Sequence, residues 1–168
     1  KSSGCQVVGV DFSSTRVMTG LQTGCDAASI DPEEFSNIVA EKTDGLGLDS
    51  VIIAASSPTS AAVEMAGEIA RDRASIVVVG DVGIDIPRRV YYEKELSVRV
   101  ARSYGPGRYD SAYEEKGRDY PVSYVRWTEN RNMDAFVKLL SLGSIDPSLL
   151  VTHRFQISDA LQAYELIA

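Results

Sequence analysis

Cysteine and histidine are scarce in this chain of 168 residues, which has two cysteines and one histidine. Cys5 and Cys25 form no CxxC pair and no Cys/His cluster, so the sequence indicates neither a zinc framework nor a disulfide scaffold. Two small buried thiols in a reducing cytosol are the simpler interpretation, and we expect a cytoplasmic protein. The lone His153 is interpreted as a structural residue on a strand, not as a base or a metal ligand.

Long apolar runs are also absent. The apolar runs of this sequence are only a few residues long, whereas a membrane-spanning helix needs roughly 20 residues. Basic residues are in the minority, with 17 Lys and Arg against 24 Asp and Glu, for a net charge of −7. A chain with this balance repels polyanions. We therefore expect neither a membrane nor a nucleic acid as a partner.

Short β-branched runs alternate with helical patterns in the first half of the chain. Residues 7–10, 51–55 and 76–79 are typical of strands with both faces buried, as in a parallel sheet. Asp31 has the properties of a helix N-cap, and residues 56–58 supply a cap and a first-turn proline for another helix. This alternation predicts an α/β fold, a Rossmann-like doubly wound parallel sheet with right-handed crossovers.

The second half of the chain has a different pattern. Residues 96–102 alternate apolar and polar side chains, which predicts an edge strand and, through it, a homo-oligomer. Residues 104–127 are rich in tyrosine and contain the only tryptophan, so they are too aromatic for a passive linker. Helical spacing predicts a helix around residues 133–140. Residues 149–151 predict a short strand, followed by a last helix through Tyr164.

The tyrosine-rich stretch has two interpretations. Its aromatic rings can pack the loop onto the sheet, which is the plainer reading. Alternatively the stretch borders a substrate pocket, where Arg126, Glu129 or Arg131 would meet a polar, sugar-like substrate.

An acidic residue stands at the carboxyl end of the first expected strand. In dinucleotide-binding folds a carboxylate at the end of the second strand accepts hydrogen bonds from the adenosine ribose, and its charge disfavours a 2′-phosphate. Asp11 in that position favours NAD over NADP. Asp11 can equally begin a turn or cap the next helix. The glycine fingerprint that should precede it, G-x-G-x-x-G after a first strand, is absent from the sequence.

Ordered segments across nearly the whole chain carry a resemblance to a known family. They are VVGVD at 7–11 with Arg16, GCDA at 24–27, GLDSVI at 47–52, IVVVG at 76–80 and THRF at 152–155. The chain resembles the nucleotide-binding domain of the medium-chain, zinc-type alcohol dehydrogenase superfamily, which includes sorbitol and threonine dehydrogenases. YGPGRYD at 104–110 and YVRWTENR at 124–131 are similar to a bacterial subgroup fused to an oxidoreductase domain of the glucose–fructose oxidoreductase type.

The resemblance implies an NAD-dependent oxidoreductase that transfers hydride between a secondary alcohol, polyol- or sugar-like, and its ketone. Asp11 would hold the adenosine ribose, and Arg16 would lie along the same part of the cofactor. No catalytic residue and no metal ligand is expected in this chain, because the zinc of such enzymes belongs to a separate catalytic domain. The other implied cofactor contacts follow strand ends and are Ala55, Ser56, Gly80, Asp81, Val82 and Ser103.

The fold lacks its first strand and glycine-rich loop in this sequence. In the strand order 3-2-1-4-5-6, the strands at 7–10 and 51–55 would then border an unfilled slot. We therefore expect residues 1–168 to be a partial NAD(P)-binding domain, a fragment of a larger chain. Two other functions stay open: a non-catalytic binding or oligomerisation module of the same fold, and a methyltransferase-like α/β domain, which also has an acidic residue at the end of its second strand.

Overall fold

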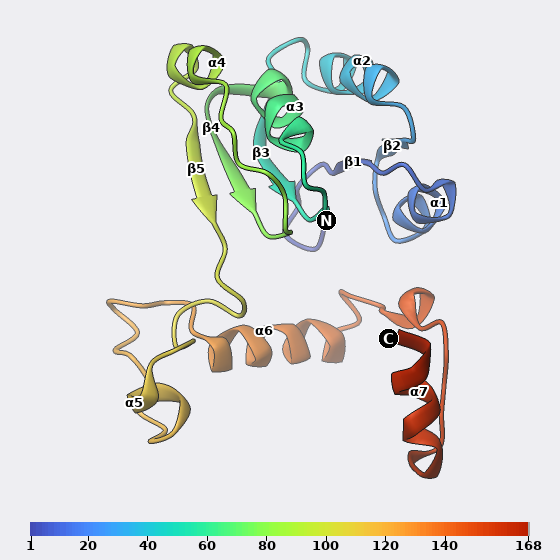
Figure 1. The fold of residues 1–168 in the computed structure, drawn as a ribbon, viewed down its shortest axis with the longest axis vertical. Coiled ribbons are helices and arrows are strands. Elements are labelled where there is room, and N and C mark those ends of the chain that lie inside the picture. Colours follow the sequence, from blue (N-terminus) through green and yellow to red (C-terminus); the bar gives the residue numbers. More distant parts are fainter. Residues whose placement is uncertain (168) are drawn as a thin grey trace.

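Two parallel sheets form the amino-terminal part of the protein, in a computed structural model that describes residues 1–167 (Figure 1). The smaller sheet pairs β1 (Val8–Val10) with β2 (Ala27–Ser29). The larger sheet has the order β3 (Leu48–Ile53), β4 (Ala70–Val78), β5 (Ser97–Val100). All three strand pairings are parallel. The α/β, Rossmann-like architecture expected from the sequence is confirmed.

Helices connect consecutive strands, as parallel pairing requires. They are α1 (Ser14–Gln22), α2 (Pro32–Lys42), α3 (Ala61–Ile69) and α4 (Arg88–Glu93). α2 begins where the sequence predicts, because the Asp31 carboxylate accepts a hydrogen bond from the backbone N–H of Glu34 at 2.8 Å. β5 pairs only with β4 and so has one free edge. Self-association through that edge stays a prediction.

The main core lies between the larger sheet and α3. Ile76 and Val78 of β4 and Val63 of α3 are almost fully buried there. Tyr91 of α4 closes the core from the side, and its hydroxyl donates a hydrogen bond to the carbonyl oxygen of Val63 at 2.7 Å. This bond satisfies the one polar atom that the buried ring brings into the core.

A second cluster holds the two sheets together. Phe35 and Val39 of α2 are 3% exposed and form a buried cluster with Ile69 of α3. Val8 of β1 and Val51 of β3 pack against this cluster. β1 and β3 are not hydrogen-bonded to each other anywhere in the described chain. The unfilled slot expected between these two strands is therefore present.

The carboxyl-terminal half carries α5 (Ser111–Glu114), α6 (Glu129–Ser141) and α7 (Ala160–Ile167) below the sheets in Figure 1. α6 and α7 confirm the two helices predicted there. The strand predicted at 149–151 is wrong, because Ser148–Leu150 form a 3₁₀ turn. The Asp146 carboxylate starts that turn by accepting the N–H of Ser148 at 2.9 Å.

Two predictions at β3 also need correction. The third helix begins at Ala61, not at residues 56–58, because Ser57 is held in a parallel bridge to Val82. One face of β3 is open: Ile52 is 71% exposed, although its apolar run predicts burial on both faces.

Two helical glycines provide a matched test of the packing around Tyr91. In Gly67→Ala the new Cβ would lie 2.5 Å from Cε2 of the Tyr91 ring, so urea denaturation should show a loss of about 1–3 kcal/mol. In Gly20→Ala the Cβ meets only the Cys25 sulfur at 3.7 Å, so helix propensity should raise stability by up to about 1 kcal/mol. Equal stabilities of the two variants would contradict this packing.

Candidate functional site

Asp11 directly follows β1, at the turn into α1. Its Oδ1 accepts a hydrogen bond from the N–H of Ser13 at 2.9 Å. Ser13 is the N-cap of α1 and its hydroxyl accepts from the N–H of Arg16 at 3.4 Å. The aspartate thus stands at the end of a strand and also organises the turn, so the two sequence readings are compatible. A role in ribose binding stays a prediction.

The other carboxylate oxygen of Asp11 lies beside Arg16. Oδ2 is 3.5 Å from Nη1 of Arg16, and the two side chains are 36% and 76% exposed. A pair this long and this exposed contributes little to stability. Oδ2 is therefore free to accept a hydrogen bond from a ligand, with a guanidinium close by.

The ends of β3 and β4 approach each other closely. A Cβ on Gly80 would lie 1.9 Å from the carbonyl oxygen of Ala55, so only glycine fits at that position. Just beyond these ends, the backbone N–H of Ser57 donates to the carbonyl oxygen of Asp81 at 2.9 Å. The carbonyl oxygen of Ser57 accepts a hydrogen bond from the N–H of Gly83 at 3.2 Å. The structure therefore brings together the predicted residues that follow these two strands, including the exposed Ser56.

Val82 belongs to the same edge but uses its side chain elsewhere. That side chain is 8% exposed and packs into the main core. In the parallel bridge, Ser57 bonds the residues on either side of Val82, so the N–H and C=O of Val82 itself point away from Ser57. Neither group has a backbone partner among the described residues.

Ser103 is the last predicted contact and lies three residues after β5. It is exposed and has a φ of 36°, which is unusual for a non-glycine residue and marks a sharp turn of the chain. Thus the structure places predicted residues after β1, β3, β4 and β5. It does not join them into one pocket, because the slot separates the Asp11 group from the others.

The loop after β5 is held by a network that the sequence analysis did not identify. The Arg108 guanidinium lies over the rings of Tyr109 and Tyr104 at 4.3 and 5.3 Å, and donates to Glu114 at 2.9 Å. These aromatic residues therefore organise their own loop, and packing of the loop onto the sheet stays a prediction.

The three polar residues singled out in this stretch have different surroundings. Arg131 is structural, because its guanidinium donates to the Tyr120 carbonyl at 2.5 Å and pairs with Asp119 at 2.9 Å. Arg126 stacks on the Trp127 ring at 4.4 Å. Glu129 lines an open groove of about 930 Å³ between β5 and α6.

The cysteines are less buried than expected: Cys5 is exposed and Cys25 is half-buried, so the expectation of two buried thiols is wrong. Across residues 1–167, no group of three or more His, Cys, Asp or Glu side chains could hold a metal ion. His153 is exposed; its Nδ1 lies 2.9 Å from the Thr152 hydroxyl, and its ring stacks on Phe155. The strand predicted around His153 is not formed. Within the same described range, no helix is both long enough and apolar enough to cross a bilayer.

Comparison with solved structures identifies the fold. The zinc-dependent alcohol dehydrogenase 2 of Streptococcus pneumonia is similar over 96% of this chain, with a TM-score of 0.66 and 21% identity. Alcohol dehydrogenase TADH of Thermus sp. ATN1 gives a TM-score of 0.68 at 19% identity. The short chain alcohol dehydrogenase rspB of E. coli CFT073, complexed with NADH, gives a TM-score of 0.65 at 23% identity. This chain spans 40% of the length of each of the three.

At these identities the likeness concerns the fold. It confirms the expected Rossmann-like fold, which this chain shares with these alcohol dehydrogenases. No family model matches the sequence, and a search of curated proteins finds no significant relative.

The hydrogen bond between Tyr120 and Asp110 allows a test of the loop network. The Tyr120 hydroxyl and the N–H of Ala112 both donate to the Asp110 carboxylate and lower its pKa. Asp110 therefore contributes stability above the ordinary aspartate pKa, and this contribution is lost as the pH falls through the lowered value. In Tyr120→Phe the pKa of Asp110 should rise, as measured by ¹³C NMR of its carboxyl group. Tyr124→Phe, at a ring that is 87% exposed, is the control; equal pKa values in both variants would contradict the network.

Proposed function

We propose that this chain is the nucleotide-binding part of an NAD-dependent oxidoreductase that transfers hydride between a secondary alcohol, polyol- or sugar-like, and its ketone. The observation that carries the proposal is the free Oδ2 of Asp11 at the carboxyl end of β1, beside the slot. Ligands of open α/β sheets bind at the carboxyl ends of strands, where the strand order reverses. The likeness to alcohol dehydrogenases, one of them complexed with NADH, supports this assignment.

Asp11 would recognise the adenosine end of the cofactor. Its Oδ2 accepts hydrogen bonds from the two ribose hydroxyls of NAD, and its negative charge disfavours the 2′-phosphate of NADP. Arg16 could attract that phosphate, but its guanidinium lies 3.5 Å from Asp11, which neutralises part of its charge. The balance of the two side chains favours NAD.

Backbone groups would recognise the nicotinamide end. The unpaired N–H and C=O of Val82 offer one donor and one acceptor, which match the C=O and NH₂ of a carboxamide. Gly80 lets the two strand ends approach without a side chain in between. When bound, NAD supplies the hydride chemistry, and the residues of this chain orient it. Zinc finds no fitting set of ligands among residues 1–167.

Cofactor preference tests the role of Asp11. In the complete polypeptide that contains this chain, Asp11→Asn should keep the turn, since an amide oxygen also accepts the Ser13 N–H, but should lose the charge that disfavours NADPH. The NADPH-to-NADH ratio of dissociation constants, measured by fluorescence titration, should fall about tenfold, which corresponds to roughly 1.4 kcal/mol. Asp31→Asn is the matched control, because Asp31 caps α2 and follows a different strand.

Two outcomes would contradict the proposal. Equal affinities of the unmodified polypeptide for NADH and NADPH would remove Asp11 from cofactor selection. Binding of neither cofactor would favour the non-catalytic module of the same fold.

A further inference from the structure

The open face of the larger sheet carries an arginine among apolar side chains. Ile76 and Val78 of β4 are buried in the main core, so Val77 between them lies on the opposite face. In the register of the sheet, Val77 is paired with Ile52 of β3 and with Arg99 of β5. Residues in register share a face of the sheet, so the Arg99 side chain stands beside Val77 on the open face.

The guanidinium of Arg99 has no acidic partner. No ion pair joins Arg99 or Arg102 to any of residues 1–167, whereas Arg71 of the same sheet pairs with Asp49 at 2.6 Å. Arg102 lies only loosely over the Tyr109 ring, at 5.6 Å from its centroid. Beside apolar side chains an ionic contact is screened less than in open solvent. Both guanidinium groups are therefore suited to bind an anion.

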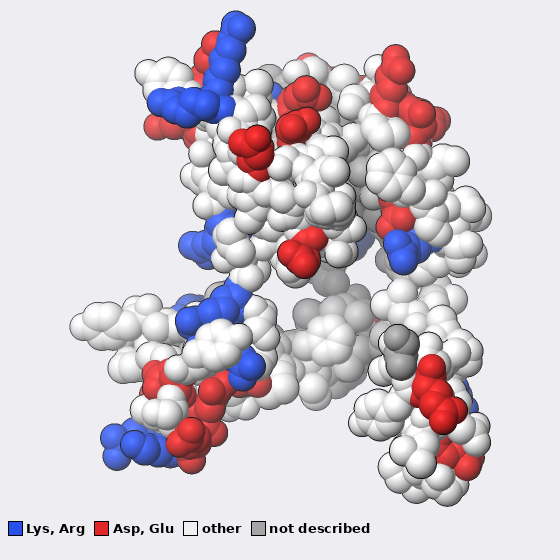
Figure 2. Space-filling model, viewed as in Figure 1, with Lys and Arg blue, Asp and Glu red and all other residues white. Residues whose placement is uncertain are grey.

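The groove between β5 and α6 has an excess of positive charge. Arg99 and Arg102 line it, and Glu129 is the one acidic residue among the lining residues of the described chain. The whole chain, in contrast, has a net charge of −7. Figure 2 shows basic side chains gathered where β5 runs into the next loop, and a hollow between the sheets and α6. Charge complementarity therefore favours an anionic ligand in this groove.

The register of β4 and β5 connects the groove to the proposed nicotinamide end. The last pair is Val78 with Val100, and the next N–H of the chain continues the ladder to the Val78 carbonyl oxygen at 2.8 Å. Counted on from that pair, Arg102 comes level with Gly80. Arg99 precedes Arg102 by three residues, which is about 10 Å of extended chain. A ligand that reaches Gly80 would thus extend along the groove past both arginines.

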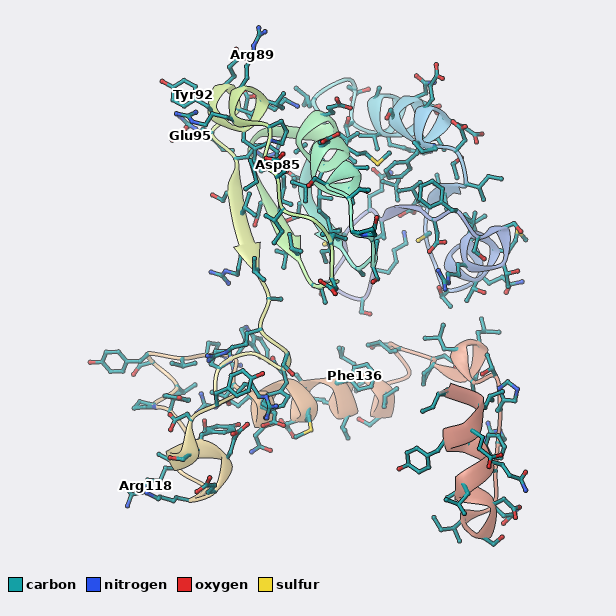
Figure 3. All side chains as sticks on the ribbon, viewed as in Figure 1. Asp85, Arg89, Tyr92, Glu95, Arg118 and Phe136 are labelled. Carbon is teal, nitrogen blue, oxygen red and sulfur yellow. The ribbon has the colours of Figure 1, made fainter. Side chains whose placement is uncertain are left out.

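The wall formed by α6 supplies polar groups that suit hydroxyls. Glu129, at the first position of α6, is half-buried and forms no ion pair within residues 1–167. Asn132 lines the groove on the same helix, and its amide offers both donors and an acceptor. Figure 3 shows Phe136 on the side of α6 toward the sheets, where it can contact the C–H groups of a carbon chain.

We infer that this groove binds the substrate of the proposed function, and that the substrate is a polyhydroxy compound with an anionic group, a carboxylate or a phosphate. Arg99 and Arg102 bind the anionic group, and Glu129 accepts hydrogen bonds from hydroxyls. The inference rests on the proposed function, because the reacting carbon must reach the cofactor beside Gly80. It adds a charge requirement that a neutral polyol does not meet.

Ligand affinities of the complete polypeptide test the charge requirement. With NADH bound, isothermal titration calorimetry measures the dissociation constants of glucitol, gluconate and glucitol phosphate, which share a carbon skeleton but differ in charge. Gluconate or glucitol phosphate should bind at least about tenfold more tightly than glucitol, because contacts to a guanidinium are charge-assisted. The tighter of the two identifies the anionic group. Equal affinities for all three compounds, or no measurable binding of either anionic compound, would overturn the inference.

Arginine substitutions locate the contact. In Arg99→Gln and in Arg102→Gln, the affinity for the preferred anionic compound should fall about ten- to hundredfold, while the affinity for glucitol stays unchanged. Arg99→Lys should retain part of the preference, because it keeps the charge but loses the fork of donors. A preference that survives when both arginines are replaced by glutamine would overturn the assignment.

A third arginine provides the matched control. Arg118→Gln removes the same charge from an exposed residue beside α5, which Figure 3 shows away from Phe136 and the groove. This variant should bind all three compounds like the unmodified polypeptide. If Arg118→Gln lost the preference as fully as Arg99→Gln, the effect would be one of net charge, and the groove would not be the site.

Binding of NADH separates this inference from the proposed function. Its dissociation constant is measured first and should be the same in Arg99→Gln and in the unmodified polypeptide. A polypeptide that binds NADH but shows no preference for an anionic compound contradicts this inference alone. A polypeptide that does not bind NADH contradicts the proposed function, and the inference with it.

Discussion

The packing of α2 over both sheets is the contact on which the arrangement depends. β1 and β3 share no hydrogen bond among residues 1–167, so the cluster of Phe35, Val39 and Ile69, against which both strands pack, fixes their relative position. α2 is itself fixed at its start by the Asp31 cap and at its far side by Ile69 of α3. If this contact were lost, the turn that holds Asp11 would have no defined position relative to the ends of β3 and β4. The geometry of the candidate site is thus a consequence of apolar packing on the opposite face from the open one.

The sequence predicts elements best where a single local force dominates. The β-branched runs of β1, β3 and β4, and the Asp31 cap of α2, show their structure directly in the sequence. β2 has only Ala27–Ser29 and no such pattern; it is a strand because β1 offers it hydrogen bonds. The apolar run at 149–151 predicts a strand that does not form. Asp146 and Pro147 start a 3₁₀ turn there, and this local turn replaces the extended backbone that a strand needs.

The candidate site was predicted by position more successfully than by role. Residues after β1, β3, β4 and β5 lie where strand ends were expected, because parallel strands end at a common edge. Sequence alone does not show that Val82 turns its side chain into the core and presents only its backbone. Nor does it show that Arg131 holds the loop through Tyr120 and Asp119, since that depends on contacts 11 and 12 residues away in the chain.

The two halves of the proposed site differ in how they can change. The proposed adenosine half would depend on the side chains of Asp11 and Arg16, which are exposed and contribute little to the fold, so substitutions there would alter cofactor preference at small cost in stability. The nicotinamide half depends on backbone groups whose positions are set by Gly80 and by the buried side chain of Val82. A larger residue at Gly80 would overlap the Ala55 carbonyl and separate β3 from β4, so a change there disrupts the sheet before it alters recognition. Under the proposed function, cofactor preference would therefore vary at β1 while the proposed hydride-transfer end stays fixed.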